Sequence, residues 1–488
     1  MGALQLVHLL LSLSHESLAT LCVNGTAVSP KPEIIGAMGF NFRSVDRDQL
    51  YVMPPSITEW LPEGHFAWAI LAAVDEMDLT EFVAAHRSDG RGGAAYDPAM
   101  MVGLLLYAYG VGERSSRRIE RRCTEDVAFR VMAANSVPDH ATLARFVTRH
   151  EAALAGLFAD VLTLCARAGL IDTSVVAIDG TKIAADAAGA ANRSLTDVAR
   201  AVVREAIETD RREDEKLGKA RGDELPAPLR NREWIKRAMG EISKDRERSI
   251  ARRPNAPRNE PKINLTDPDS RIMRRPQGFV QGYNAQAAVS GDQIVVAAAL
   301  LQDPVDTDAL KPMAEQALIR LHRVGKSAAT LLADAGYWSP ENGIAELGAE
   351  LLIATHKRTA SPIVVNVDEL QTFIEGAIAG ASTHRTAAAR FGIPKTNFTR
   401  LVEAYQHDAR ASLSRLRMVA KLADPAARRR YDRRGITVEP VFGQIKSVRG
   451  MGRFRRRGLA ACSAEWMMMV TTHNLLKWWR HGARPAAA

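Results

Sequence analysis

The chain has 488 residues, 46% of them hydrophobic, which is enough for two or three domains with a sizeable core. Its formal net charge of +9 favours a polyanionic partner. The four cysteines are isolated and no apolar run approaches the length of a membrane span. The sequence therefore argues against a disulfide framework, a zinc site or a membrane protein, and it indicates a reducing, cytoplasmic environment.

Residues 1–37 begin with an apolar stretch that lacks the basic segment of a signal peptide. We interpret them as an N-terminal extension that is either disordered or translated from an upstream start codon. Residues 481–488 are interpreted as a C-terminal tail.

Residues 38–169 are predicted to form an all-α domain. Apolar residues recur there at three-to-four spacing, and Asp139 stands where it would cap the last helix. Arginines including Arg117 and Arg118 recur at helical spacing and give the third helix a basic face, for which a solvated bundle surface is the alternative. The predicted helices span 67–77, 98–110, 115–134 and 140–169.

Two apolar segments further along each end in an aspartate followed by a small residue. These are Asp179 and Asp334, and the pattern is typical of a buried strand that presents a carboxylate at its C-terminal end. A third carboxylate, Glu439, stands just before Pro440, which favours the first turn of a helix. Three oxygen ligands without a nearby histidine or cysteine suit Mg²⁺ or Mn²⁺ better than zinc. Taken singly, either aspartate could instead cap a helix or close a turn.

Residues 170–480 are predicted to form an α/β core with two helical insertions, at about 186–260 and 360–430. Residues 254–276 are predicted to be a loop because turn formers are frequent there. The core elements are predicted to be a strand ending at Asp179, a hairpin of strands 282–290 and 293–301, a helix over 308–324, a strand over 330–333 and a strand over 350–355.

The second insertion contains a helix-turn-helix pattern. Small residues fill a first helix, Gly392 marks the turn, and Lys395 and Arg400 fall in the opening turns of a second helix. We expect the second helix to contact DNA; an ordinary helical hairpin has the same pattern and is the alternative.

Basic residues are concentrated around Glu439. Between residues 428 and 457 only Asp432 and Glu439 oppose the cations, whereas a solvated face would mix the two signs. The run therefore predicts phosphate binding. Its members expected to contact DNA include Arg449, Arg453, Arg455, Arg456 and Arg457.

The three carboxylates and the residues around Glu439 resemble the DDE transposases of bacterial insertion sequences. That group often carries a Tyr-x2-Arg-x3-Glu-x6-Lys signature. Tyr431, Arg434, Glu439 and Lys446 recur here, with four residues instead of three between the arginine and the glutamate. The resemblance extends from about residue 38 to residue 479, and it implies an RNase H-like catalytic core preceded by a helical domain that helps to bind the element ends.

The resemblance implies a transposase that cuts a strand at the terminal inverted repeats of its element and joins the freed 3′-OH to target DNA. Asp179 would bridge two Mg²⁺ or Mn²⁺ ions, with Asp334 on one and Glu439 on the other. Lys446 would bind phosphate near the cleavage site, and Tyr431 and Arg434 would contact the terminal nucleotides. Because two DNA ends must be paired, a homodimer is expected. An RNase H-like nuclease without joining activity, and a catalytically inactive DNA-binding protein derived from a transposase, remain as alternatives.

Two other candidates for the third carboxylate, and one candidate phosphate-binding loop, have structural explanations. Glu341 follows a serine and a proline closely enough for helix capping, and Glu465 precedes an apolar run typical of a core helix. Arg320 stands where a phosphate-binding loop would need its leading glycine, so the sequence does not support ATP binding.

Overall fold

The computed structural model describes residues 56–85, 95–194, 262–356 and 366–482, with isolated positions between 195 and 261. The predicted N-terminal extension, most of the first insertion and the tail beyond Gly482 lie outside the described residues. Within the part that is described, none of the helices is long and apolar enough to span a lipid bilayer.

The N-terminal region is helical, as predicted. Asp139 caps α7 by accepting hydrogen bonds from the backbone N–H groups of Ala141 at 3.0 Å and Thr142 at 2.9 Å. Two of the predicted helices are each divided, at Asp126 and at His150, where the backbone leaves the helical conformation. After a 3₁₀ turn, η1 (Ile57–Glu59), the helices are α2 (Phe66–Asp75), α3 (Thr80–Ala84), α4 (Pro98–Gly110), α5 (Ser116–Glu125), α6 (Val127–Met132), α7 (His140–Arg149) and α8 (Glu151–Arg167).

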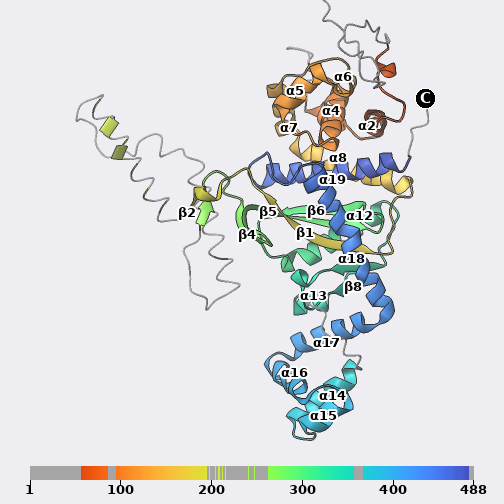
Figure 1. The fold of residues 1–488 in the computed structure, drawn as a ribbon, viewed down its shortest axis with the longest axis vertical. Coiled ribbons are helices and arrows are strands. Elements are labelled where there is room, and N and C mark those ends of the chain that lie inside the picture. The colour runs from red at the N-terminus through yellow and green to blue at the C-terminus, as the bar shows by residue number, and fades with distance from the viewer. Residues whose placement is uncertain are drawn as a thin grey trace, which may run out of the picture. The chain divides into compact units, whose positions relative to one another are not determined.

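A mixed sheet follows the helical region (Figure 1). β1 pairs antiparallel with β5 and parallel with β7, and β7 pairs parallel with β8. β5 is long enough to pair with β1 along one side and with β4 and then β6 along the other. The strands are β1 (Val176–Ala184), β4 (Arg271–Arg275), β5 (Gly278–Ser290), β6 (Val295–Leu301), β7 (Thr330–Ala333) and β8 (Glu350–Ile353).

The predicted hairpin, the helix after it and the two later strands are confirmed by β5 and β6, α12 (Leu310–Arg323), β7 and β8. The loop predicted over 254–276 is partly wrong, because β4 forms within it. β4 alternates buried and exposed residues, with Met273 fully buried between the exposed Ile272 and Arg274, as a half-buried strand requires. The turn formers that surround this short alternation hid it in the sequence.

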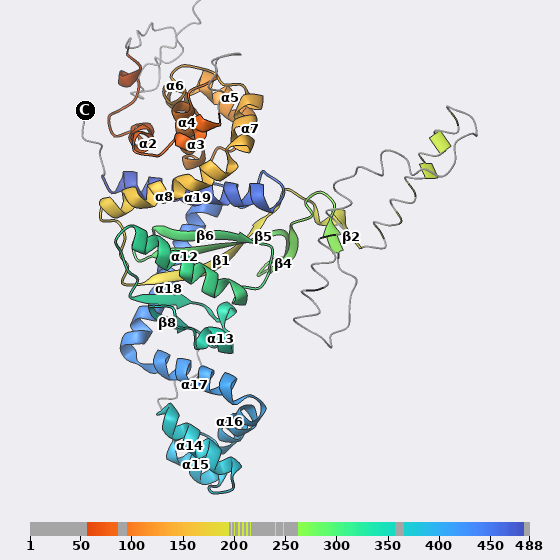
Figure 2. The same cartoon turned by 180° about the vertical axis from the view of Figure 1, so that it is seen from behind.

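Three helices from distant parts of the chain pack on the sheet. α12 lies against β6, α18 (Pro425–Gly443) against β1, and α19 (Leu459–Arg480) against β6. Figures 1 and 2 show α19 running beside α8, so the last helix joins the sheet to the N-terminal helices. The Asn474 side chain fixes this packing, because it donates to the Val295 carbonyl at 2.8 Å and accepts from the Val295 N–H at 2.9 Å. The core helix predicted after Glu465 is thereby confirmed.

The second insertion has a hydrophobic core of its own, in which Leu370, Ile374 and Phe398 are fully buried. Gly392, with φ +62°, makes the turn between the second and third helices, a conformation that favours glycine. The predicted helix, turn and helix are confirmed, and their contact with DNA stays a prediction. The helices are α14 (Val367–Ile378), α15 (His384–Arg390), α16 (Lys395–His407) and α17 (Ala409–Ala423).

The first insertion leaves the sheet after β1. It starts and ends in a two-stranded ladder formed by β2 (Asn192–Ser194) and β3 (Lys262–Asn264). The remaining short elements are η2 (Gly189–Ala191), η3 (Thr307–Ala309), η4 (Ala335–Tyr337) and α13 (Pro340–Gly343), together with a π-helical turn, η5 (Gln444–Val448), that continues α18.

Candidate active site

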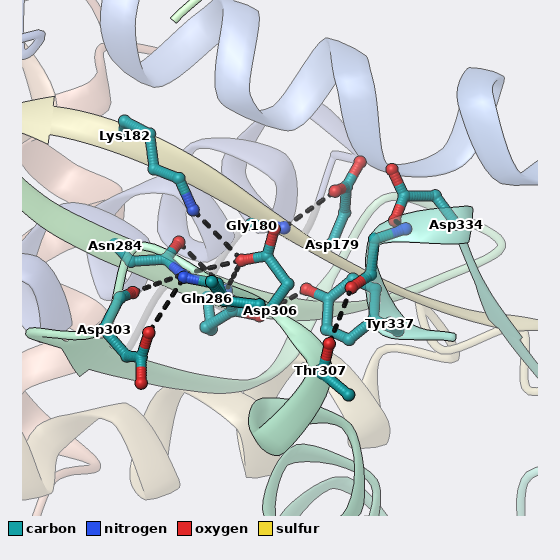
Figure 3. Close-up of polar contacts among 12 residues, drawn as sticks. Asp179, Gly180, Lys182, Asn284, Gln286, Asp303, Asp306, Thr307, Asp334 and Tyr337 are labelled. Atoms are coloured by element: carbon teal, nitrogen blue, oxygen red, sulfur yellow. Dashed lines mark hydrogen bonds and ion pairs between the residues drawn. The ribbon is translucent and has the colours of Figure 1, made fainter. Parts of the chain in front are cut away.

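The parallel pairing of β1 and β7 brings Asp179 and Asp334 together. Ile178 lies opposite Ala333, and each is followed directly by one of the two aspartates, which lie close together in Figure 3. Asp334 follows the end of β7, as predicted. Asp179 lies inside β1 and not at its end, because pairing with the longer β5 carries β1 on to Ala184.

The Asp179 carboxylate is electrostatically strained. Burial raises the pKa of this carboxyl from 3.8 to about 6, and the negative charge of Asp334 adds to the rise. The Arg434 guanidinium and the Gly180 N–H, which donates at 2.8 Å, act in the opposite direction. Since the pKa remains raised, these donors compensate only part of the cost of holding two carboxylates close together in a partly buried site.

Glu439 lies within α18 instead of at a helix start, so the prediction made from Pro440 is wrong. A proline inside a helix leaves the carbonyl four residues earlier without its N–H donor, here that of Ile436. The Gln293 side chain supplies the missing hydrogen bond to this carbonyl at 3.1 Å. A residue of the turn between β5 and β6, distant in the sequence, therefore makes the proline tolerable, which the local sequence could not reveal.

Arg434 lies between the carboxylates. Its Nη1 is 2.8 Å from Asp179 Oδ2, and its Nη2 is 3.7 Å from Glu439 Oε1. The Glu439 side chain is 68% exposed, whereas those of Asp179 and Arg434 are 17% and 18% exposed. Of the signature residues on α18, Arg434 therefore contacts Asp179 directly, and Glu439 lies on the solvent side of Arg434.

Two further arginines of α18 attach this helix to the region around the sheet. Arg430 pairs with Glu350 on β8 at 2.8 Å, and Arg433 pairs with Asp172, just before β1, at 2.9 Å. Ion pairs therefore hold α18 at several points of the chain, and they absorb part of the charge of the basic run.

Lys446 lies in the π-helical turn η5, and its Nζ donates to Thr181 Oγ1 at 2.9 Å. Thr181 and Asp179 are two residues apart on β1 and so lie on the same face of the sheet. Burial and the nearby Arg275 guanidinium lower the pKa of Lys446. The structure therefore brings Asp179, Asp334, Arg434 and Lys446 together around β1, and their role in catalysis stays a prediction.

A second polar cluster, which the sequence did not suggest, lies on the opposite face of β1 (Figure 3). Asp306 Oδ1 accepts from Asn284 Nδ2 at 2.6 Å, Gln286 Nε2 at 2.9 Å and Lys182 Nζ at 3.1 Å. Gln286 also accepts a hydrogen bond from the hydroxyl of Tyr337, which lies in the turn η4 that follows Asp334. The cluster thus connects β5 with the turn that presents Asp334. Its only sequence signal is the alternation of Asn284 and Gln286 with apolar residues in the middle of β5.

The donors fit a hard divalent cation only in part. Two adjacent carboxylates provide oxygen ligands, and the raised pKa of Asp179 shows that its negative charge is only partly compensated by the protein. In the described part of the chain, however, no three residues of the types His, Cys, Asp and Glu converge on a single cation position. Glu439 is the carboxylate that stays apart, and the Arg434 guanidinium lies between it and Asp179.

The other predicted DNA contacts in the basic run differ in their accessibility. Arg449 is buried, and its guanidinium donates to Thr472 Oγ1 and the Met469 carbonyl, both at 2.8 Å. Arg456 pairs with Glu151 and Arg457 with Asp186. Arg453 is exposed and donates to the Ala185 carbonyl at 3.1 Å, and Arg455 is exposed without a side-chain partner among the described residues.

Arg117, Lys395 and Arg400 are exposed and have no ion pair with a described carboxylate, whereas Arg118 pairs with Glu113 at 3.0 Å. Tyr431 is half-buried next to Arg428, whose guanidinium carbon lies 5.6 Å from the ring centroid.

The two rival carboxylates lie elsewhere. Glu341 is in the first turn of α13, where Ser339 makes the capping hydrogen bond. Glu465 is buried and pairs with Arg114 from the loop before α5. Its carboxylate also accepts the backbone N–H groups of Arg455 and Arg456, so it anchors the basic loop and does not join the site.

Comparison with known families identifies the class of protein. Residues 55–149 match a family model described as Transposase domain (DUF772), and this segment contains α2 to α7. Residues 397–479 match a family model described as Transposase DDE domain, and this segment contains Arg434, Glu439 and Lys446. The two domains indicate a transposase. Together they support the resemblance to the DDE transposases of insertion sequences. Neither a curated protein nor a solved structure matches the chain.

Proposed function

We propose that this chain cuts DNA at the ends of its element and transfers the cut strand into target DNA, using one centre that contains Asp179, Asp334 and Glu439. The observation that carries the proposal is the parallel pairing of β1 with β7, which sets two aspartates from distant segments beside each other. The matched DDE domain contains Glu439, on a helix (α18) that packs against β1, and Lys446, whose Nζ contacts Thr181 of β1.

We further infer that the core is RNase H-like. The support is the chain order of β1, the β5–β6 hairpin, α12, β7 and β8, with β1 antiparallel to β5 and parallel to β7, and β7 parallel to β8. The two insertions leave this order intact, because one begins after β1 and the other after β8.

Asp179 and Asp334 would hold Mg²⁺ or Mn²⁺, and Glu439 is the third proposed ligand. When bound, two such ions would stabilise the charge that builds on the attacking and leaving oxygens of a phosphodiester. Arg434 would keep the Asp179 carboxylate oriented, since its Nη1 donates to Oδ2. Lys446 would bind a phosphate of the cut strand, because its side chain lies on the same face of β1 as Asp179 and makes no ion pair with a described carboxylate.

The proposed partners are double-stranded element ends and target DNA, with a homodimer as the working form. Exposed cations on separate elements would supply non-specific phosphate contacts, and the opening turns of α16 would approach base edges. These residues are Arg117, Lys395, Arg400, Arg453 and Arg455.

The test is a cleavage assay with Mg²⁺ on a labelled duplex carrying the genomic flanks of the coding sequence, with a supercoiled plasmid as target. Wild type is expected to nick the duplex and to form plasmid-joined product, and Asp179→Asn, Asp334→Asn and Glu439→Gln should abolish both while retaining duplex binding. Asp172→Asn is the matched control, because this aspartate also pairs with an α18 arginine but lies outside the site. Cutting without joined product would favour a nuclease, and binding without cutting would favour an inactive DNA-binding protein.

A further inference from the structure

A row of cations runs along the later part of β1, away from the two aspartates. Lys446 contacts the Thr181 side chain at 2.9 Å, Arg275 donates to the Lys182 carbonyl, and Arg453 donates to the Ala185 carbonyl at 3.1 Å. These positions follow one another along β1 and the residue just after it, so the row covers roughly 20 Å from Asp179, at about 3.3 Å per residue. The backbone of residues 452–454 lies directly against this end of β1, as hydrogen bonds at both sides of Ala184 show.

Neighbouring cations of this row repel each other, Arg453 acting on Arg275 and Arg275 on Lys446. None of them makes an ion pair with a carboxylate in the described part of the chain. Burial, and then the neighbouring Arg453, lower the pKa of Arg275, and Arg275 in turn lowers the pKa of Lys446. Like charges held this close are costly unless an anion binds between them, so the row is suited to a run of phosphates.

The row ends at a pocket of about 600 Å³ with an exposed aromatic residue at its edge. The pocket is lined by Arg453 and Arg457, by the chain just after β1, and by Phe279. The Phe279 side chain is 77% exposed, which is unusual for so large an apolar group. Phe279 lies opposite Arg274 in the β4–β5 hairpin, so an aromatic face and a further guanidinium stand side by side.

We propose that this surface, made of Lys446, Arg275, Arg453 and Phe279, binds an unpaired single-stranded segment of DNA that leads away from the catalytic aspartates. The phosphates would follow the cations, and a base would stack on Phe279 over the pocket. The base must be unpaired, because in a duplex both of its faces are covered by neighbouring base pairs. The pocket has the volume of a site for a ligand of nucleotide size. Asp186 also lines the pocket, but its charge is already paired with Arg457 at 2.9 Å.

The inference rests on the proposed function for its ligand class, DNA, and it adds that the DNA end is unpaired next to the cutting site. The test measures binding of fluorescein-labelled dT15 and of a 15-base-pair duplex to the full-length protein by fluorescence anisotropy, in EDTA. Without metal no cleavage is required. If the wild type cuts DNA but replacing Phe279 does not weaken dT15 binding, only this inference is refuted. If binding depends on Phe279 as described but the wild type never cuts DNA, only the proposed function is refuted.

Phe279→Ala and Phe279→Leu are expected to weaken dT15 binding about tenfold and duplex binding by less than about twofold, as for the loss of one stacked base. Phe279→Trp should bind dT15 as tightly as wild type, since only an aromatic face can stack. Arg453→Gln should reduce by about one the slope of log Kd against log salt for dT15. Arg323→Gln, an exposed cation on α12, should leave the slope unchanged.

Thermal melting of each variant confirms that it is folded. Phe279 is exposed, so its replacement should not change the melting temperature. Wild-type dT15 binding by folded Phe279→Leu, or equal losses in Phe279→Leu and Phe279→Trp, would overturn the stacking site. An unchanged salt slope in Arg453→Gln would overturn the phosphate path.

Discussion

Replacing Asp179 by asparagine is expected to make the folded protein more stable at neutral pH. Burial raises the pKa of the Asp179 carboxyl from 3.8 to about 6, even though the Arg434 guanidinium acts against the rise. At about 1.4 kcal/mol per pH unit, the difference corresponds to about 3 kcal/mol of folding free energy lost by holding the charge in place. Asparagine removes the charge but keeps an oxygen that can accept from Arg434.

The sign of the pH dependence follows from the direction of the shift. Above pH 6 the folded protein carries the full cost. As the pH falls from 6 to 3.8 the folded state takes up the proton before the unfolded state does, so the cost disappears. In EDTA, Asp179→Asn should therefore melt several degrees above wild type at pH 7.5, and the difference should vanish near pH 4.

A matched substitution is expected to act in the opposite direction. Burial would raise the pKa of Asp172, but hydrogen bonds from Ser174 and Arg433 outweigh it and lower that pKa below its usual value. Asp172→Asn should therefore lower the melting temperature at pH 7.5, with an effect that is lost as the pH falls. Scanning calorimetry of both variants between pH 4 and pH 8 measures the two differences. An Asp179→Asn protein that melts at or below the wild-type temperature at pH 7.5 would refute the electrostatic reasoning.

Three further predictions concern residues in and around the candidate site. Gly180→Ala would place a Cβ 2.3 Å from Gln286 Nε2, so it should lower stability by about 1–3 kcal/mol in chemical denaturation, whereas Gly189→Ala, with open space around it, should have almost no effect; equal effects would contradict this. Glu465→Ala leaves a buried guanidinium unpaired and should cost about 3–5 kcal/mol by the same measurement, and a loss below about 1 kcal/mol would contradict the anchoring role. Lys446→Gln should reduce the salt dependence of duplex binding by about one phosphate contact, measured as the slope of log Kd against log salt, and an unchanged slope would remove Lys446 from the DNA surface.

The sequence predicted those parts of the site that depend on local patterns. Asp334 follows a short apolar strand, and both the strand and the aspartate are where periodicity placed them. The helical N-terminal region, with Asp139 as a cap, was predictable for the same reason. The grouping of Asp179 with Asp334 was inferred from resemblance, and the parallel register of β1 and β7 gives it a geometric basis.

The parts that sequence reasoning missed depend on distant partners. Pro440 indicated a helix start, but Gln293 supplies the hydrogen bond that lets α18 continue through it. Arg449 belongs to a basic run, yet its guanidinium is buried against α19. The spacing of Asp306 and Gln286 in the sequence does not predict the hydrogen bond between them. Side-chain contacts between segments so far apart are determined by the packing of the sheet and its covering helices, and a local sequence pattern does not predict them.

The measurement that tests the central claim most directly is Mn²⁺ binding, followed by electron paramagnetic resonance of the free ion in titrations of wild type and variants. If the three carboxylates form one metal centre, Asp179→Asn, Asp334→Asn and Glu439→Gln should each weaken binding at least about tenfold, while Asp172→Asn should bind as wild type does. Wild-type affinity in Glu439→Gln would contradict the claim that the carboxylate now separated from Asp179 by Arg434 belongs to the centre. Wild-type affinity in all three variants would remove the metal site from this part of the fold.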